Sequence, residues 1–230
     1  MAPMTSPRYV HLRLHSEYSV TDGIVRIGDA VKRAAGDGMP AMAVTDLGNL
    51  FGLVKFYTGA RGKGVKPIAG ADVWIANPDT PEDAHRLLLL ARNRIGYQQL
   101  CELLTKAYLV EGRRDRAEIR REWFSEIGSD GLIALSGAHL GDVGEALLNG
   151  NFDLATERAQ AWEAIFPGAF YLEVQRYGQP QQEAVVQQTA DLAGETGIPL
   201  VATHPIQLLN RDDFQAHEAR VCIAEGYVLS

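Results

Sequence analysis

The stretch Met39-Pro-Ala-Met-Ala-Val-Thr-Asp46 decides the fold class, because it is a short and almost uninterrupted apolar run. Such runs are typical of strands that are covered on both faces of a sheet. The segment Phe51–Ala60 follows with apolar residues at helical spacing, and Lys66–Ile75 is the next apolar run. The pattern therefore predicts a strand, a helix and a second strand.

The same alternation of apolar runs and amphipathic segments continues along the chain. Further strands are predicted at Tyr9–His15, Arg86–Asn93, Leu132–Gly137, Phe170–Arg176 and Ile198–His204. Further helices are predicted at Ile24–Ala35, Ile95–Leu109, Val143–Leu148, Leu154–Phe166, Gln181–Thr196 and Asp212–Gly226. About seven strand–helix units predict an α/β fold with a parallel sheet, either closed as a small β/α barrel or doubly wound.

The composition is that of a globular protein rather than a disordered or fibrous one. Of the 230 residues, 46% are apolar and 22% are charged. Apolar runs such as Leu87–Ala91 are far shorter than the roughly 20 residues that a membrane-spanning helix needs. Residues 1–7 lack the features of a signal peptide, so we expect a short flexible tail and a cytoplasmic protein. Cys101 and Cys222 are accordingly expected to be reduced and buried.

The charge pattern bears on nucleic-acid binding. A net charge of −7 argues against a domain that tracks the phosphate backbone of DNA by itself. The stretch Glu111–Arg121 is locally basic, and it is predicted to be a solvated loop or helix face. The alternative for this stretch is a contact with a phosphate group or a partner.

Histidine and carboxylate residues recur where the predicted strands end, which is where β/α proteins place their chemistry. In Tyr9–His15, a period of two places His11, Arg13 and His15 on one face. Asp22 comes shortly after the first predicted strand, and Asp46, His139 and His204 lie at or just after strand ends. Asp72 lies within Lys66–Ile75, and His85 directly precedes Arg86–Asn93. Such a set is typical of a multi-metal phosphoesterase, and the alternative is an internally satisfied polar core.

Several segments of the chain resemble one family. The stretch Tyr9-Val-His-Leu-Arg-Leu-His-Ser-Glu-Tyr-Ser-Val-Thr-Asp-Gly23 is similar to the start of the PHP (polymerase and histidinol phosphatase) domain of bacterial replicative DNA polymerase III alpha subunits. Further similar segments are 43–52, 66–72, 93–100, 135–137, 141–144 and 212–218. The resemblance covers essentially the whole chain in order. It implies a distorted seven-unit β/α barrel, a single domain over residues 1–230, and an N-terminal fragment of a much longer polymerase subunit.

The resemblance also implies a metal site, which this sequence retains only in part. Active PHP domains bind metal ions through histidine, cysteine and carboxylate ligands, and they hydrolyse phosphoesters with metal-activated water. The ligand positions that are kept are His15, Asp22, Asp72 and His85. The positions at which a ligand is lost are Arg13, Leu47, Ala138, Pro205 and Gln207. The residues His11, Asp46 and His204 are expected to add polar lining to the vestigial site.

A permanent cation at position 13 repels a divalent metal, and we expect Arg13 to pair with Asp22 or Asp72 instead. We therefore expect no bound metal, no cofactor and no catalytic residue in this domain. The alternative is a divergent phosphoesterase, a 3′–5′ exonuclease or a pyrophosphatase, with Zn²⁺ or Mn²⁺ at the kept positions.

By resemblance, the full-length parent is a DNA-directed DNA polymerase. Its Mg²⁺-dependent nucleotidyl transfer belongs to a polymerase domain whose aspartates these residues do not supply. The expected role here is a scaffold that stabilises the polymerase and docks the proofreading exonuclease subunit. A purely structural brace is a further alternative. The expected partners are the remaining polymerase domains and that exonuclease, while DNA is bound through the full-length replicase and no membrane is involved.

Overall fold

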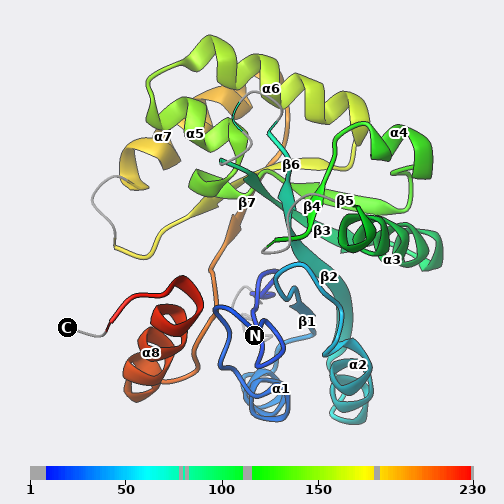
Figure 1. The fold of residues 1–230 in the computed structure, drawn as a ribbon, viewed down its shortest axis with the longest axis vertical. Helices are drawn as coiled ribbons and strands as arrows, with labels where there is room; N and C mark the ends of the chain where they lie inside the picture. Colours follow the sequence, from blue (N-terminus) through cyan, green and yellow to red (C-terminus); the bar gives the residue numbers. More distant parts are fainter. Residues whose placement is uncertain (1–8, 78–79, 81–82, 111–115, 179–181, 229–230) are drawn as a thin grey trace, which may run out of the picture. The chain divides into compact units, whose positions relative to one another are not determined.

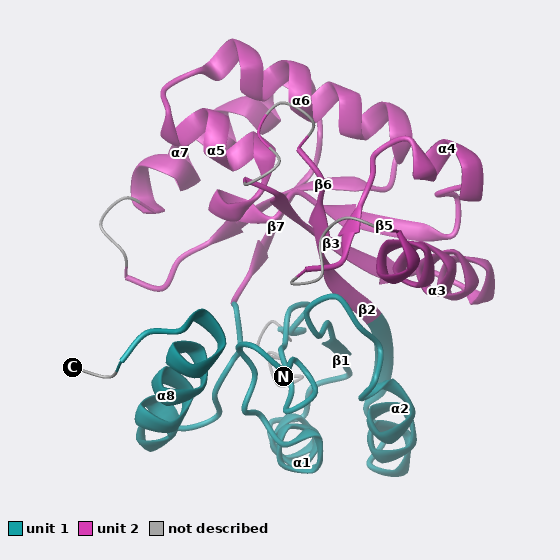
Figure 2. Cartoon of the chain, viewed as in Figure 1, with its two compact units in different colours: residues 1–69, 205–230 teal, residues 70–204 magenta. Residues whose placement is uncertain are grey.

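The computed structural model describes residues 9–77, 80, 83–110, 116–178 and 182–228. The expected tail at residues 1–7 lies outside this part of the chain. The chain divides into two compact units (Figures 1 and 2). Unit 1 comprises Met1–Ala69 and Pro205–Ser230, and unit 2 comprises Gly70–His204.

Unit 1 is built around the predicted strand, helix and strand. Strand β1 (Ala41–Val44) pairs in parallel with the first residues of β2 (Lys66–Ile75), in the register Ala41↔Lys66 to Val44↔Ala69. Its helices are α1 (Ile27–Gly36), α2 (Leu53–Gly62) and α8 (Phe214–Glu225), the last preceded by the short 3₁₀ helix η2 (Arg211–Asp213).

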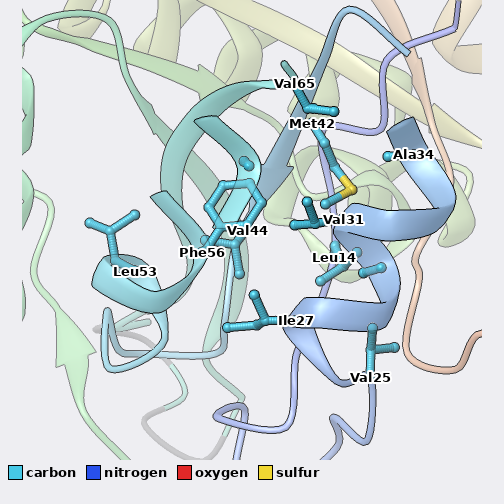
Figure 3. Packing of buried hydrophobic residues seen from close by; sticks show 12 residues of the cluster. Leu14, Val25, Ile27, Val31, Ala34, Met42, Val44, Leu53, Phe56 and Val65 are labelled. Carbon is cyan, nitrogen blue, oxygen red and sulfur yellow. The ribbon is translucent and has the colours of Figure 1, made fainter. Parts of the chain in front are cut away.

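The core of unit 1 follows from helical periodicity. Helix α1 buries Ile27, Ala30, Val31 and Ala34, which recur at three- and four-residue spacing on one face. They pack with side chains of β1 and α2, among them Val44 and Phe56 (Figure 3). This apolar core fixes the loop ends at which the polar residues of the unit lie.

The strand predicted at Tyr9–His15 is wrong. This segment forms only isolated bridges, Leu14↔Ile206 and Ser16↔Val25, although Ala43 N donates to His11 O at 2.8 Å. Three consecutive side chains, Arg13, Leu14 and His15, are all buried. Leu14 N donates to Thr45 Oγ1 at 2.9 Å, so a side-chain oxygen replaces a backbone carbonyl as its acceptor, and the regular ladder of a strand is interrupted there. The alternation that was to group His11, Arg13 and His15 is therefore not that of a regular strand.

Unit 2 contains a mixed sheet. Its strands are the rest of β2, β3 (His85–Ala91), β4 (Glu118–Ile119), β5 (Leu132–Leu135), β6 (Phe170–Gln175) and β7 (Leu200–Thr203). Strand β3 runs antiparallel to both β2 and β5, whereas the pairs β2–β4, β5–β6 and β6–β7 are parallel. The predicted parallel sheet is wrong at β3, because residues 76–84 are too few for the crossover of about a dozen residues that a parallel pair needs.

The helices of unit 2 mostly match the predicted segments. They are α3 (Arg94–Leu109), α4 (Trp123–Ile127), α5 (Asp142–Leu148), α6 (Phe152–Ile165) and α7 (Gln182–Thr196), with the 3₁₀ helix η1 (Ala138–Leu140) before α5. Strand β4 and helix α4 were not predicted. Strand β4 lies in the basic stretch Glu111–Arg121, of which residues 111–115 are outside the described part of the chain.

Two smaller expectations are also decided by the structure. Cys101 and Cys222 are free thiols, but both are half-buried rather than buried. Among the described residues, no helix is long and apolar enough to cross a membrane.

Candidate metal centre

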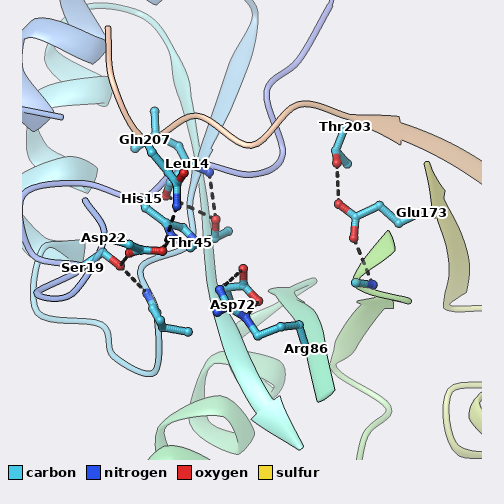
Figure 4. Close-up of polar contacts among 12 residues, drawn as sticks. Leu14, His15, Ser19, Asp22, Thr45, Asp72, Arg86, Glu173, Thr203 and Gln207 are labelled. Carbon is cyan, nitrogen blue, oxygen red and sulfur yellow. Dashed lines mark hydrogen bonds and ion pairs between the residues drawn. The ribbon is translucent and has the colours of Figure 1, made fainter. Parts of the chain in front are cut away.

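The loop after Leu14 brings together His15 and Asp22, two of the kept ligand positions. Its shape depends on Gly23, since a Cβ there would lie 2.0 Å from Ser16 O. His15 Nδ1 lies 2.7 Å from Asp22 Oδ2 (Figure 4). Because a carboxylate can only accept, this nitrogen carries the proton when Asp22 is ionised. In this structure the two side chains bind each other.

Asp22 accepts two further hydrogen bonds. Ser19 Oγ donates to its Oδ1 at 2.6 Å, and Gln207 Nε2 donates to its Oδ2 at 2.9 Å. Gln207 stands at a lost ligand position, so an amide N–H faces Asp22 where the family places a metal ligand. Leu47, a second lost position, takes part through its backbone, as its N–H donates to Ser19 Oγ at 3.0 Å.

Asp46 lies at the end of β1 and is bound by one residue at both oxygens. Ser16 N donates to Oδ1 at 2.6 Å, and Ser16 Oγ donates to Oδ2 at 2.9 Å. Burial raises the pKa of the Asp46 carboxyl above its ordinary value, and the two hydrogen bonds from Ser16 oppose part of that rise.

Asp72, the kept carboxylate of unit 2, is fully buried and held by Arg86. The guanidinium binds it with two hydrogen bonds, Nε to Oδ1 at 3.1 Å and Nη2 to Oδ2 at 2.7 Å (Figure 4). The antiparallel β2–β3 pair positions both residues, since Arg86 is opposite Trp74 and Asp72 is opposite Leu88. Arg86 also stacks on Trp74, with its Cζ 4.5 Å from the ring centroid. Sequence reasoning missed Arg86, although a buried aspartate calls for a nearby cation.

His85 is engaged at both ring nitrogens. Asn77 Nδ2 donates to Nε2 at 3.2 Å, and since Nε2 therefore accepts, the proton is on Nδ1. Nδ1 lies 3.7 Å from Glu145 Oε2, which also accepts from Arg158 Nη1 at 3.2 Å. This kept ligand position belongs to a hydrogen-bonded network of unit 2.

The other predicted residues have varied settings. Arg13 is buried, with 3% of its surface exposed, and its expected pairing with Asp22 or Asp72 stays a prediction. His11 is half-buried, with its ring edge-on to Tyr9 at 4.8 Å. Ala138 is buried at a φ of +51°, which a non-glycine residue rarely adopts. Pro205 is half-buried and His204 is exposed.

A further buried carboxylate, Glu173 in β6, was missed by sequence reasoning. Its Oε2 accepts from Gly137 N at 3.1 Å, and its Oε1 accepts from Thr203 Oγ1 (Figure 4). Oε1 also accepts from Gln175 Nε2 at 3.1 Å. The available signal was a lone glutamate within the apolar strand Phe-Tyr-Leu-Glu-Val-Gln. These contacts join the ends of β5, β6 and β7.

The kept residues do not fit a divalent metal ion. A ligand must present a free lone pair, whereas Asp72 faces a guanidinium and Asp22 faces the amide N–H of Gln207. In the described part of the chain, no group of three or more His, Cys, Asp or Glu residues could hold a metal ion. In each unit, the kept residues instead form hydrogen bonds and ion pairs with neighbouring side chains.

Comparison with solved structures identifies the fold class. The chain is similar to an amidohydrolase from Chromobacterium violaceum solved with bound sulfate and no metal, at a TM-score of 0.55 and 15% identity, covering 92% of this chain and 96% of that one. It is also similar to a protein from Bifidobacterium adolescentis assigned as a metal-dependent phosphoesterase, at a TM-score of 0.53 and 10% identity, covering 94% and 97% of the two chains. These similarities confirm the predicted α/β fold of the distorted β/α barrel class.

The family model of the PHP domain matches residues 11–177. The chain belongs to the PHP domain family, as the sequence segments indicated. It is 53% identical over 229 residues to DNA polymerase III subunit alpha from Neisseria meningitidis serogroup A, a match that covers 99% of this chain and 20% of that protein. The chain thus spans about a fifth of the length of the curated relatives that it matches.

Proposed function

We propose that this chain is the PHP module of a bacterial replicative DNA polymerase III alpha subunit. Identity of 53% over nearly the whole chain supports this assignment. Templated DNA synthesis, with its Mg²⁺ ions, is then the task of other parts of such a polymerase, and DNA is bound through the complete replicase. The same proposal places the protein in the cytoplasm.

Within that role, the module is a scaffold rather than a phosphoesterase. The observation that carries this proposal is the buried Asp72–Arg86 pair, in which a permanent cation holds both oxygens of a vestigial metal ligand. The Gln207 amide likewise donates a hydrogen bond to Asp22, a second vestigial metal ligand. Both contacts offer N–H groups to oxygens that would have to coordinate a metal, and removing either would leave a carboxylate short of partners.

The partners of the scaffold are the other polymerase domains and the proofreading exonuclease subunit. A module without its own hydrolytic centre leaves proofreading to a separate subunit, which must then be held near the growing strand. The net charge of −7 supports a protein-binding rather than a DNA-tracking surface.

Binding of purified exonuclease subunit to the 230-residue chain tests this function. Size-exclusion chromatography of the mixture should give a 1:1 complex, and the chain alone should not hydrolyse a 3′-labelled oligonucleotide or pyrophosphate with Zn²⁺ or Mn²⁺ present. Separate elution would leave only the structural brace. Metal-dependent hydrolysis that is lost in His15→Ala would establish the phosphoesterase alternative.

A further inference from the structure

The basic stretch singled out by the sequence contains three arginines, Arg116, Arg120 and Arg121, in the described part of the chain. Each of them stacks on a different tryptophan. Arg121 Cζ lies 4.2 Å from the Trp162 ring centroid, Arg116 Cζ lies 4.8 Å from that of Trp74, and Arg120 Cζ lies 5.9 Å from that of Trp123. These are the three tryptophans of the sequence, and all three distances are within the range of about 6 Å for cation–π attraction.

The three tryptophans belong to three different elements of unit 2. Trp74 is in strand β2, Trp123 begins helix α4, and Trp162 is in helix α6. The segment 116–121 also contributes a buried apolar residue, Ile119, which pairs with Ile75 in the β2–β4 pair. Ala76 N donates to Ile119 O at 2.9 Å. One short segment therefore contacts the sheet and two helices of the same unit.

The charges of two of the arginines are matched inside the unit. Arg121 Nη2 lies 2.7 Å from Asp142 Oδ2, and Asp142 also accepts from Trp162 Nε1 at 2.9 Å. Arg116 Nε donates to Glu118 Oε1 at 2.7 Å. Asp142 is itself buried, so its contact with Arg121 supplies the countercharge that a buried carboxylate needs.

We infer that residues 116–121 form a strap that fastens helices α4 and α6 to the sheet of unit 2 by stacking arginine on tryptophan. A guanidinium suits this task because its planar group can lie against a ring face while the N–H groups at its edge donate hydrogen bonds. The charges of Arg116 and Arg121 are thus neutralised within unit 2. This inference concerns the packing of unit 2 and does not depend on the proposed function, although Trp74 also contacts Arg86.

Conservative Arg→Lys variants of the 230-residue chain test the strap, because they keep the charge and remove the planar stack. The distances set an order: Arg121→Lys and Arg116→Lys should each lower the Tm by about 2–4 °C, and Arg120→Lys should lower it least. Each of the first two should also change the tryptophan emission spectrum. The exposed Arg94 at the start of α3 provides the control, and Arg94→Lys should change neither quantity.

The specific contact is tested by a double-mutant cycle of Arg116→Lys with Trp74→Leu. The Tm shifts of the two single variants should exceed, when added, the shift of the double variant, because the second change removes a contact already lost. Binding of a fluorescein-labelled single-stranded oligonucleotide should be the same for Arg116→Lys, Arg116→Gln and the parent chain. Additive shifts with an unchanged emission spectrum, or oligonucleotide binding that falls in Arg116→Gln alone, would overturn the strap.

Discussion

Arg86 binds both carboxylate oxygens of Asp72 from the neighbouring strand, at 3.1 and 2.7 Å, and Asp72 has no exposed surface. The two residues are paired across the antiparallel β2–β3 ladder, with Arg86 further fixed by Trp74. A cation thus occupies the neighbourhood in which the PHP family resemblance implies a metal ligand.

The first prediction concerns this pair. Arg86→Ala should reduce the free energy of unfolding by roughly 3–5 kcal/mol, because it leaves the buried Asp72 without this countercharge. Urea denaturation followed by circular dichroism measures the change. The exposed Arg92, which directly follows β3, is the matched control, and Arg92→Ala should stay within about 0.5 kcal/mol of the parent. Equal effects of the two variants would refute the role of the pair.

The second prediction concerns Asp22. Asp22→Ala should lower stability by about 2–3 kcal/mol, since it removes the acceptor for His15, Ser19 and Gln207. The exposed Asp37 after α1 is the control, and Asp37→Ala should change stability by less than about 0.5 kcal/mol. Urea denaturation at neutral pH compares the two, and a loss below that of the control would contradict the hydrogen-bonded cluster.

The third prediction concerns glycines in unit 1. Gly23→Ala should destabilise the chain by roughly 1–3 kcal/mol or more, because the added Cβ would lie 2.0 Å from Ser16 O. Gly28 in α1 has no atom within 4 Å of an added Cβ, so Gly28→Ala should instead stabilise by about 0.5–1 kcal/mol. Thermal unfolding of both variants checks the opposite signs.

The fourth prediction is a pH dependence caused by Asp46. Burial raises the pKa of this carboxyl above 3.8, so the folded chain holds the proton to a higher pH than the unfolded chain. Stability from this group is therefore fully present below the unfolded pKa and is lost as the pH rises through the folded pKa. The unfolding free energy of the parent minus that of Asp46→Asn should accordingly fall as the pH rises from about 3.5. A difference that rises or stays flat over this range would contradict the direction of the shift.

The sequence predicted the elements whose periodicity is strong. The predicted strand Lys66–Ile75 matches β2 at both ends. The helix predicted at Ile95–Leu109 differs from α3 only at its first residue, which is Arg94 in the structure. The direction of β3 was missed because apolar runs look alike in parallel and antiparallel strands. Strand β4 is only two residues long, and its pairing with β2 depends on tertiary contacts that periodicity does not contain.

The candidate site was predictable as a set of positions but not as a set of contacts. The sequence singled out His15, Asp22, Asp72 and His85, and the structure brings the first two into contact. The partners Arg86 and Glu145 were missed, because cross-strand register and helix placement decide which side chains meet. Gln207 was predicted to be a lost ligand position. Its hydrogen bond to Asp22 could not be predicted, because it depends on how the chain after residue 205 folds back against the loop that contains Asp22.

The metal content of the purified chain decides whether the kept ligand positions hold metal. The 230-residue chain is incubated with a small excess of Zn²⁺ and Mn²⁺, dialysed, and measured by elemental analysis. We expect far less than one equivalent of either metal, with no change after Asp22→Ala. One or more equivalents that disappear in Asp22→Ala would contradict this expectation, since the oxygens now facing Arg86 and Gln207 would then be able to coordinate.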